Sequence, residues 1–219
     1  MLPRLTGPRH KPHDGGKPRQ LVVLLHGVGA DGNDLIGLAP YWAPMLPGAE
    51  FLAPDGPYPC DMAPFGRQWF SLQDRSSDAI LAGVRATAPI VDAFLDEALA
   101  ERGLQPAQLA LVGFSQGTMM SLYVGPRRAA PLAGIVGYSG ALIGADALPH
   151  ELRSLPPVLL VHGDADEIVP PSTLPRAVSG LEAAGIAVES ILCPGLAHGI
   201  DEAGLKRGIA FLRRVLEPA

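Results

Sequence analysis

The chain has 219 residues, a length at which α/β architectures are commonly single, so we expect one domain over residues 1–219. Hydrophobic residues make up 47% of the sequence and charged residues 18%, which excludes a disordered protein. The formal net charge of −5 provides no basic stripe that could neutralise phosphates, and this excludes a nucleic-acid partner.

The cysteine count argues against a disulfide-framework protein, and the hydropathy pattern argues against a membrane-spanning one. Cys60 and Cys193 are too few for a disulfide framework, and a reducing cytoplasm is the simpler expectation. Prolines, glycines and arginines interrupt the first ten residues, and no later stretch is an uninterrupted apolar span. We therefore expect a cytoplasmic protein without a targeting segment or an integral membrane segment.

The N-terminal region leads into the first confident strand. Residues 1–20 form a polar, turn-rich arm that is compatible with a short edge strand at 2–6. Residues 21–25 are all apolar, as in a strand that is buried on both faces. A glycine-rich turn at 26–32 follows, and we expect a helix over 33–42. The spacing of this turn is not that of a phosphate-binding P-loop, and no lysine follows it.

A second strand, expected over 50–53, is followed by a long segment without clear periodicity. This segment, 58–78, holds several aromatic side chains, and loops of such length tend to be functional. Its aromatic residues are equally well explained as anchors to the core. Under either interpretation we expect the segment to form a wall of the site, with Phe65 and Trp69 as candidate substrate contacts.

The remainder of the chain alternates helices with strands. A helix is predicted over 78–102, with Asp78 as its cap, Gly103 as its end and Pro89 as the cause of a kink or a break. The loop 139–146 carries two candidate pocket residues, Leu142 and Ile143. Further strands are expected at 133–138, 158–161 and 187–192, and further helices at 174–184 and 201–216. This alternation predicts a mostly parallel sheet covered by helices on both faces.

Residues 109–122 are typical of a nucleophile elbow. A buried strand, a turn and a helix follow one another, and the turn has the pattern G-x-S-x-G around Ser115. Glycines at 113 and 117 are needed because the serine occupies a strained conformation in which a neighbouring β-carbon would collide with the strand or the helix. Ser115 is therefore the candidate nucleophile, and the backbone N–H of Gln116 is a candidate oxyanion donor.

A serine hydroxyl needs a histidine base that a carboxylate orients, and the elbow predicts the order serine, acid, histidine. Three acidic residues compete in the turn after the strand at 158–161: Asp164, Asp166 and Glu167. Asp166 is preferred because it lies deeper in the turn, whereas the other two are also explained as solvated turn residues. His198 follows the last strand and is flanked by small residues, so it is the candidate base.

The other histidines have simpler explanations. His10, His13 and His150 lie in polar or surface segments, and His26 and His162 each close a strand, where a hydrogen bond to the backbone is expected. No histidine spacing supports a metal site, and we expect no cofactor. The second oxyanion donor is expected in the loop after the first central strand, where Val28 is the best candidate.

The chain closely resembles the phospholipase/carboxylesterase family of small serine hydrolases, which includes acyl-protein thioesterases and bacterial carboxylesterases. The matching stretches run over nearly the whole length and are LLHGVGADG (24–32), PDGP (54–57), RQWF (67–70), GFSQG (113–117), YSG (138–140), HGDADEIVP (162–170) and AHG (197–199). One departure is Ser71, which stands where the family commonly has an aspartate after the Trp-Phe pair, so contacts made there are expected to differ.

The resemblance implies an α/β-hydrolase fold without a large cap domain, and acyl ester or thioester substrates. It also implies Ser115, Asp166 and His198 as the triad, which decides for Asp166 among the three acidic residues. The oxyanion donors implied are Val28 and Gln116. Family membership alone does not separate ester from thioester preference.

We therefore predict a serine carboxylesterase for short- to medium-chain acyl esters, acting through an acyl-enzyme and compatible with a homodimer. Phe65, Trp69, Leu142 and Ile143 are the expected acyl pocket. An acyl-protein thioesterase or a lysophospholipase with the same triad is the alternative within enzymes. A non-catalytic hydrolase scaffold that binds a ligand is the alternative from another class, but it would not require all three triad members in order.

Overall fold

The computed structural model describes residues 2–217 and is built on a seven-stranded sheet of order β1-β3-β2-β6-β7-β8-β9. Neighbouring strands are parallel throughout except for β1, which pairs antiparallel with β3. The strands are β1 (Arg9–His10), β2 (Gln20–Leu25), β3 (Ala49–Leu52), β6 (Leu109–Phe114), β7 (Gly134–Tyr138), β8 (Val158–Gly163) and β9 (Val188–Cys193). A separate two-stranded hairpin joins β4 (Tyr58–Pro59) to β5 (Arg67–Gln68).

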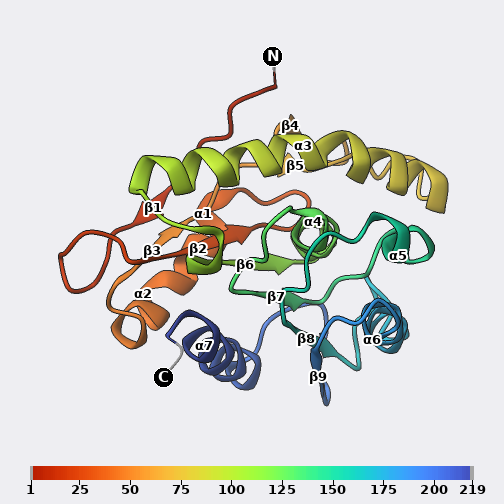
Figure 1. The fold of residues 1–219 in the computed structure, drawn as a ribbon. Helices are drawn as coiled ribbons and strands as arrows, with labels where there is room; N and C mark the ends of the chain where they lie inside the picture. Colours follow the sequence, from red (N-terminus) through yellow and green to blue (C-terminus); the bar gives the residue numbers. More distant parts are fainter. Residues whose placement is uncertain (1, 218–219) are drawn as a thin grey trace.

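Helices cover both faces of the sheet, which confirms the predicted architecture (Figure 1). One face packs against α3 (Ser77–Arg102), α4 (Gln116–Val124), α5 (Leu148–Glu151) and α6 (Thr173–Ala183). The other packs against α1 (Gly32–Leu35), α2 (Ala39–Trp42) and α7 (Glu202–Leu216). Short 3₁₀ turns occur at η1 (Ile36–Leu38), η2 (Ala43–Met45), η3 (Pro106–Gln108), η4 (Gly125–Arg127) and η5 (Ala145–Ala147).

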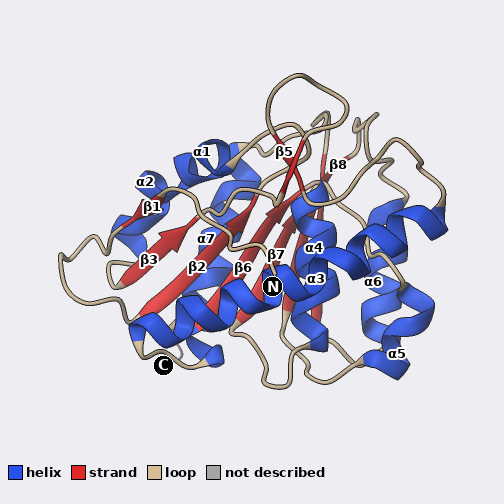
Figure 2. Ribbon diagram, turned by 90° about the horizontal axis from the view of Figure 1, so that it is seen from above, coloured by secondary structure: helices blue, strands red, loops and turns tan. Residues whose placement is uncertain are grey.

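Strand β2 shows how the apolar run produces two cores. Leu21, Val23 and Leu25 point to the α3 face, whereas Val22 and Leu24 point to the α7 face, since successive side chains of a strand alternate. All five are fully buried. Figure 2 shows the parallel strands running in one direction, so their carboxyl ends meet at one edge. In residues 2–217 no cap domain covers this edge.

The edge strand lies at Arg9–His10, so the expectation of a strand at 2–6 is wrong. Pairing with β3 begins only at Arg9, because Pro8 has no N–H to donate. The preceding residues reach the chain after β3 through carbonyls alone: Ala53 N donates to Pro8 O, and Asp55 N donates to Thr6 O.

Two predicted helices differ from the sequence expectation. Helix α3 runs without a break through Pro89, because buried residues on both sides of the proline, including Val84 and Leu95, hold the two halves on the sheet. Its N-cap is Ser76 rather than Asp78, while Gly103 ends it in the left-handed conformation, as predicted. The single helix expected over 33–42 is divided into α1, η1 and α2.

Candidate active site

The candidate catalytic residues lie in loops that leave the carboxyl ends of the parallel strands. Val28 follows β2, Ser115 follows β6, Asp166 follows β8 and His198 follows β9. Residues that are 170 positions apart in the sequence therefore meet at one edge of the sheet. This edge is where open α/β sheets bind ligands.

Ser115 occupies the turn between β6 and α4 in a strained conformation. Its φ of 53° and ψ of −114° are rare for a residue with a side chain. A β-carbon at Gly113 would collide with the backbone of Gly117 and Thr118, and one at Gly117 would collide with the carbonyl of Leu25. The two glycines of the G-x-S-x-G pattern are thus required by the closeness of β2, β6 and α4.

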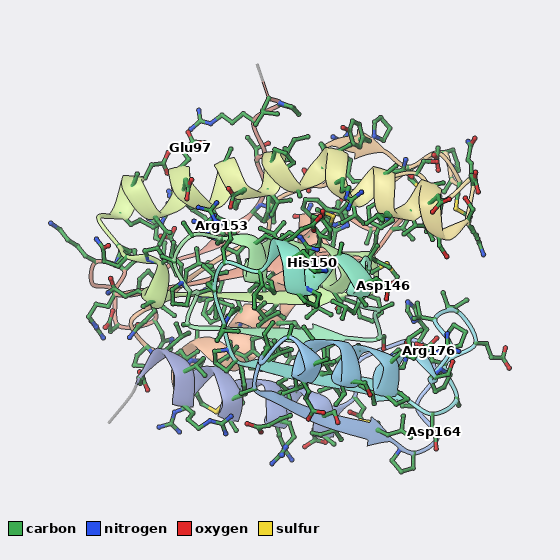
Figure 3. All side chains as sticks on the ribbon, turned by 45° about the vertical axis from the view of Figure 1, so that its right-hand side comes forward. Glu97, Asp146, His150, Arg153, Asp164 and Arg176 are labelled. Carbon is green, nitrogen blue, oxygen red and sulfur yellow. The ribbon has the colours of Figure 1, made fainter. Side chains whose placement is uncertain are left out.

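The acidic turn after β8 presents only Asp166 to His198. Asp166 Oδ2 lies 2.7 Å from His198 Nδ1, and the Asp166 side chain is fully buried. Asp164 instead accepts a hydrogen bond from Gly195 N at 2.6 Å and lies exposed beside the end of β9 (Figure 3). Glu167 is exposed as well. Of the three competing acids, Asp166 alone is placed to orient the histidine.

The Asp166 carboxylate accepts three hydrogen bonds and has a second histidine beside it. Oδ1 accepts from Ile168 N and Val169 N, each at 2.9 Å, and Oδ2 faces His162 Nε2 at 3.2 Å as well as His198. Burial by itself would raise the pKa of Asp166, but the hydrogen bonds from His198, Val169 and Ile168 outweigh it and lower the pKa below its usual value. Asp166 is therefore an anion that can stabilise a charged imidazole.

The loop that carries His198 is fixed on both sides. Ser139 Oγ donates to the carbonyl of Gly199 at 3.2 Å, and the His198 ring lies 4.9 Å from the ring of Phe114 at a tilt of 47°. Ser139 is the second non-glycine residue at positive φ, with a value of 48°. Because Nδ1 faces Asp166, Nε2 is the ring nitrogen that remains available for proton transfer.

Tyr138 and Ser139 connect the nucleophile to the histidine loop. The carbonyl of Tyr138 accepts from Ser115 N at 2.9 Å and from Thr118 Oγ1 at 2.8 Å, and Ser139 then reaches Gly199. Since the Ser115 amide is already bonded, it is not free to bind an oxyanion. The Gln116 amide opens α4, where the first N–H groups of a helix have no intrahelical acceptor.

The side chain of Gln116 has a separate, structural role. Its Oε1 accepts from Trp69 N at 2.8 Å, and its Nε2 donates to Phe70 O at 2.7 Å. Both ends of the amide are thereby used to fix the segment after β5 against the elbow. Only the backbone N–H of Gln116 is left to face a ligand.

The loop that carries Val28 is anchored to the segment around β5. Gly29 N donates to Arg67 O at 2.8 Å, and Arg67 N donates to Ala30 O at 2.7 Å. A β-carbon at Gly66, which has a φ of 79°, would collide with the carbonyl of Gly29. Within the described residues Val28 N has no hydrogen-bond acceptor, so it is available at the site.

His26 stabilises the same loop, as the sequence predicted. Its Nε2 accepts from Gly56 N at 2.8 Å, so its Nδ1 carries the proton and donates to Gly27 O at 2.7 Å. The ring is fully buried, and this burial lowers the pKa of His26. The backbone contact expected for His162 is confirmed too, because its Nε2 lies 2.9 Å from Val169 O.

Trp69 does not line the predicted acyl pocket. Its side chain is fully buried, its Nε1 donates to the carbonyl of His26 at 2.8 Å, and its ring lies 5.2 Å from that of His26. A buried indole is stable here because its one donor is satisfied at the end of β2. Trp69 therefore supports the Val28 loop from behind.

The other three predicted pocket residues lie in different surroundings. Phe65 is 73% exposed in the hairpin between β4 and β5. Leu142 and Ile143 are half-buried and pack against the core on the α3 face, where Leu142 approaches Gly180 of α6. The sequence did not indicate the contact of His162 with Asp166 or the role of Ser139, since neither belongs to a recognisable spacing.

Across residues 2–217, no group of three or more His, Cys, Asp or Glu side chains is arranged to hold a metal ion. None of the helices described there is long and apolar enough to cross a lipid bilayer.

Comparisons with known proteins identify the family and the fold of the chain. Residues 13–216 match the sequence profile of the family described as Phospholipase/Carboxylesterase. The crystal structure of esterase PE8 is 42% identical and has a TM-score of 0.93, covering 97% of this chain and 100% of that one. Esterase YpfH of Escherichia coli K12 is 28% identical over 195 residues, which are 89% of this chain and 82% of YpfH. Acyl-protein thioesterase 1 of Gibberella zeae is 26% identical over 214 residues, with 90% of this chain and 91% of that protein covered.

Proposed function

The chain belongs to the phospholipase/carboxylesterase family, has the α/β-hydrolase fold and is a carboxylic ester hydrolase, and we propose that it acts through Ser115, His198 and Asp166. The contact of 2.7 Å between Asp166 Oδ2 and His198 Nδ1 carries this proposal. The strained turn at Ser115 and the two available N–H groups of Val28 and Gln116 support it.

In the first half-reaction Ser115 Oγ attacks the acyl carbon while His198 Nε2 takes the hydroxyl proton. The carbonyl oxygen becomes an oxyanion, which the N–H groups of Val28 and Gln116 bind. Asp166 holds the imidazole in the tautomer with the proton on Nδ1 and stabilises the imidazolium. His198 then protonates the leaving alcohol, and the acyl group remains on Ser115.

In the second half-reaction His198 removes a proton from water, which attacks the acyl carbon of the acyl-enzyme. A second oxyanion forms at the same two N–H groups. Its collapse releases the carboxylic acid, and the proton held by His198 returns to Ser115 Oγ. The enzyme is thus regenerated without a cofactor.

The acyl group in this proposal is of short to medium length and contacts Phe65, Leu142 and Ile143. All three are apolar, and Phe65 belongs to the hairpin whose β5 strand anchors the Val28 loop. If this assignment holds, Phe65→Ala will shift the chain-length preference among p-nitrophenyl esters, whereas an unchanged profile would remove Phe65 from the acyl site.

A thioester is the second candidate substrate, because the chain matches a protein named acyl-protein thioesterase 1 over 90% of its length. Paired ester and thioester substrates with the same acyl group will measure the preference. The proposed compartment is the cytoplasm, which agrees with both cysteines, Cys60 and Cys193, being free thiols in the structure.

The decisive test of the triad combines labelling with kinetics. A fluorophosphonate probe should label wild-type protein at Ser115 and should not label Ser115→Ala. Hydrolysis of p-nitrophenyl acetate should fall by roughly four to six orders of magnitude in that variant. Equal hydrolysis by the two proteins would exclude Ser115 as the nucleophile.

A further inference from the structure

A hollow of about 250 Å³ lies beside the catalytic histidine and has no role in the triad or the oxyanion hole. It is lined by Asp34, Leu35, Leu38, Phe114, Gly199 and Ile200. We refer to it as the Phe114 hollow. Its walls come from three distant parts of the chain: α1 and η1 after the Val28 loop, the end of β6, and the loop after His198.

The Phe114 hollow is lined by residues adjacent in the chain to Ser115 and His198. Phe114 directly precedes Ser115, and its ring lies 4.9 Å from the ring of His198. Gly199 and Ile200 directly follow His198. The hollow is therefore on the histidine side of the site, whereas Leu142 packs toward α6 on the opposite face of the sheet.

The chemistry of ester cleavage decides which half of a substrate belongs on the histidine side. In the tetrahedral intermediate the oxyanion faces the two N–H donors, and the leaving oxygen must lie next to His198 Nε2 to receive its proton. The group attached to the leaving oxygen then extends past the imidazole. The residues that flank His198 there include Phe114, Gly199 and Ile200, which form one side of the Phe114 hollow.

We infer that the Phe114 hollow binds the leaving-group half of the substrate, as an apolar alcohol or thiol of about the size of a benzyl group that carries no negative charge. This inference rests on the proposed function and specifies its substrate class. It separates the roles of two regions, with the alcohol or thiol in the hollow and the acyl chain elsewhere.

The size and charge of the hollow set the class of leaving group. A cavity of about 150 Å³ is enough for benzene, so 250 Å³ accommodates one ring with a short linker. Four lining residues are apolar side chains, namely Leu35, Leu38, Phe114 and Ile200. The one charged lining residue is Asp34, whose carboxylate has no ion pair among the described residues. A phosphate-bearing or carboxylate-bearing leaving group would meet its negative charge without a compensating cation.

The first experiment compares two ratios of kcat/KM. Benzyl acetate against methyl acetate varies the leaving group, and the two alcohols have similar acidity, so the ratio reports binding rather than intrinsic reactivity. Methyl butyrate against methyl acetate varies the acyl group. Leu38→Trp fills the hollow from a half-buried position and should lower the benzyl-to-methyl ratio by about tenfold or more. The butyrate-to-acetate ratio should stay the same.

Two further variants protect this test against a misfolded protein. Leu155→Trp places the same residue at an exposed leucine outside the hollow and should change neither ratio. Leu38→Ala enlarges the hollow and should shift the preference toward naphthylmethyl acetate relative to benzyl acetate. An altered butyrate-to-acetate ratio in Leu38→Trp would overturn the inference. It would also be overturned if the benzyl-to-methyl ratio of Leu38→Trp and the naphthylmethyl-to-benzyl ratio of Leu38→Ala both stayed at their wild-type values.

The second experiment tests the charge. Wild-type protein should prefer benzyl acetate over its 4-carboxybenzyl analogue, and Asp34→Asn should reduce that preference by several-fold, with a larger effect at low salt. An unchanged preference would contradict the role given to Asp34. If the fluorophosphonate probe did not label wild-type protein, the proposed function would be overturned, and this inference with it. Failure of the inference alone would leave the labelling intact, so the two results can be distinguished.

Discussion

His162 Nε2 lies 3.2 Å from Asp166 Oδ2, the same oxygen that His198 Nδ1 approaches at 2.7 Å. His162 is only 2% exposed, and its Nε2 also lies 2.9 Å from the carbonyl oxygen of Val169. The N–H of Val169 in turn donates to Asp166 Oδ1. The turn from 162 to 169 thus closes on the carboxylate from two sides. His162 is a positioning residue, because it reaches the reaction only through Asp166.

Replacing His162 should therefore affect the orientation of the triad. His162→Phe leaves the carbonyl of Val169 without its buried donor and removes the imidazole beside Asp166 Oδ2, which should cost about 1–3 kcal/mol of unfolding free energy. We expect kcat to fall between about tenfold and about a hundredfold with little change in KM, since the loosened carboxylate misplaces the base. His162→Gln keeps a donor near the Nε2 position and should recover most of both losses. Equal kcat values for His162→Phe and wild type, measured under conditions in which both proteins are fully folded, would argue against a positioning role.

The three hydrogen bonds to Asp166 make stability depend on acid pH in a defined direction. The pKa of Asp166 is lower in the folded protein than in the unfolded chain, where an aspartate has a pKa of about 3.9. Its contribution to stability is therefore complete above that value and is lost as the pH falls through the folded pKa. The gap in unfolding free energy between wild type and Asp166→Asn should shrink below about pH 4. Urea denaturation at a series of pH values measures the gap, and the contributions of other carboxyl groups cancel in the difference.

The elbow could be predicted from the sequence because its physical requirements are local. Gly113 and Gly117 are needed where β2, β6 and α4 meet, and a G-x-S-x-G pattern between an apolar strand and a helix expresses that requirement in consecutive residues. The central strands were predictable for a similar reason, since strands buried on both faces of the sheet, such as β2 and β8, consist largely of apolar residues.

The remaining features depend on contacts between distant segments, which no spacing reveals. Trp69 reads as a candidate substrate contact in the sequence, but the carbonyl of His26, 43 positions away, provides the acceptor that buries it. Pro89 predicts a kink or a break, but the helix is continuous because the burial of Val84 and Leu95 outweighs one missing hydrogen bond. The contact of Ser139 with Gly199 and the Phe114 hollow likewise arise only when the loops are assembled.

The burial of Trp69 predicts a change in stability without a change in specificity. Trp69→Phe keeps most of the apolar volume but leaves the carbonyl of His26 without its donor, at a cost of about 1–3 kcal/mol. Because the indole lies behind the Val28 loop, the order of preference among acyl chain lengths should stay as in wild type. Denaturant unfolding and a p-nitrophenyl ester series check both statements. A changed order of preference among acyl chain lengths would instead indicate that Trp69 contacts the acyl group of the substrate.

The strain at Ser115 should be visible once the hydroxyl is gone. Both Ser115→Ala and Ser115→Gly remove the nucleophile, but only glycine adopts a φ of 53° and a ψ of −114° without steric cost. We expect the free energy of unfolding of Ser115→Gly to exceed that of Ser115→Ala by about 1 kcal/mol. The reason is that the relief of backbone strain outweighs the greater conformational entropy that glycine gives the unfolded chain. Gly37→Ala, at an open site with normal φ, is the matched control and should stabilise the protein by about 0.4–1 kcal/mol, because alanine restricts the unfolded chain and meets no strain there. If Ser115→Ala proved the more stable of the two, the turn would not store strain at the nucleophile, and the positive φ would be an ordinary feature of the loop.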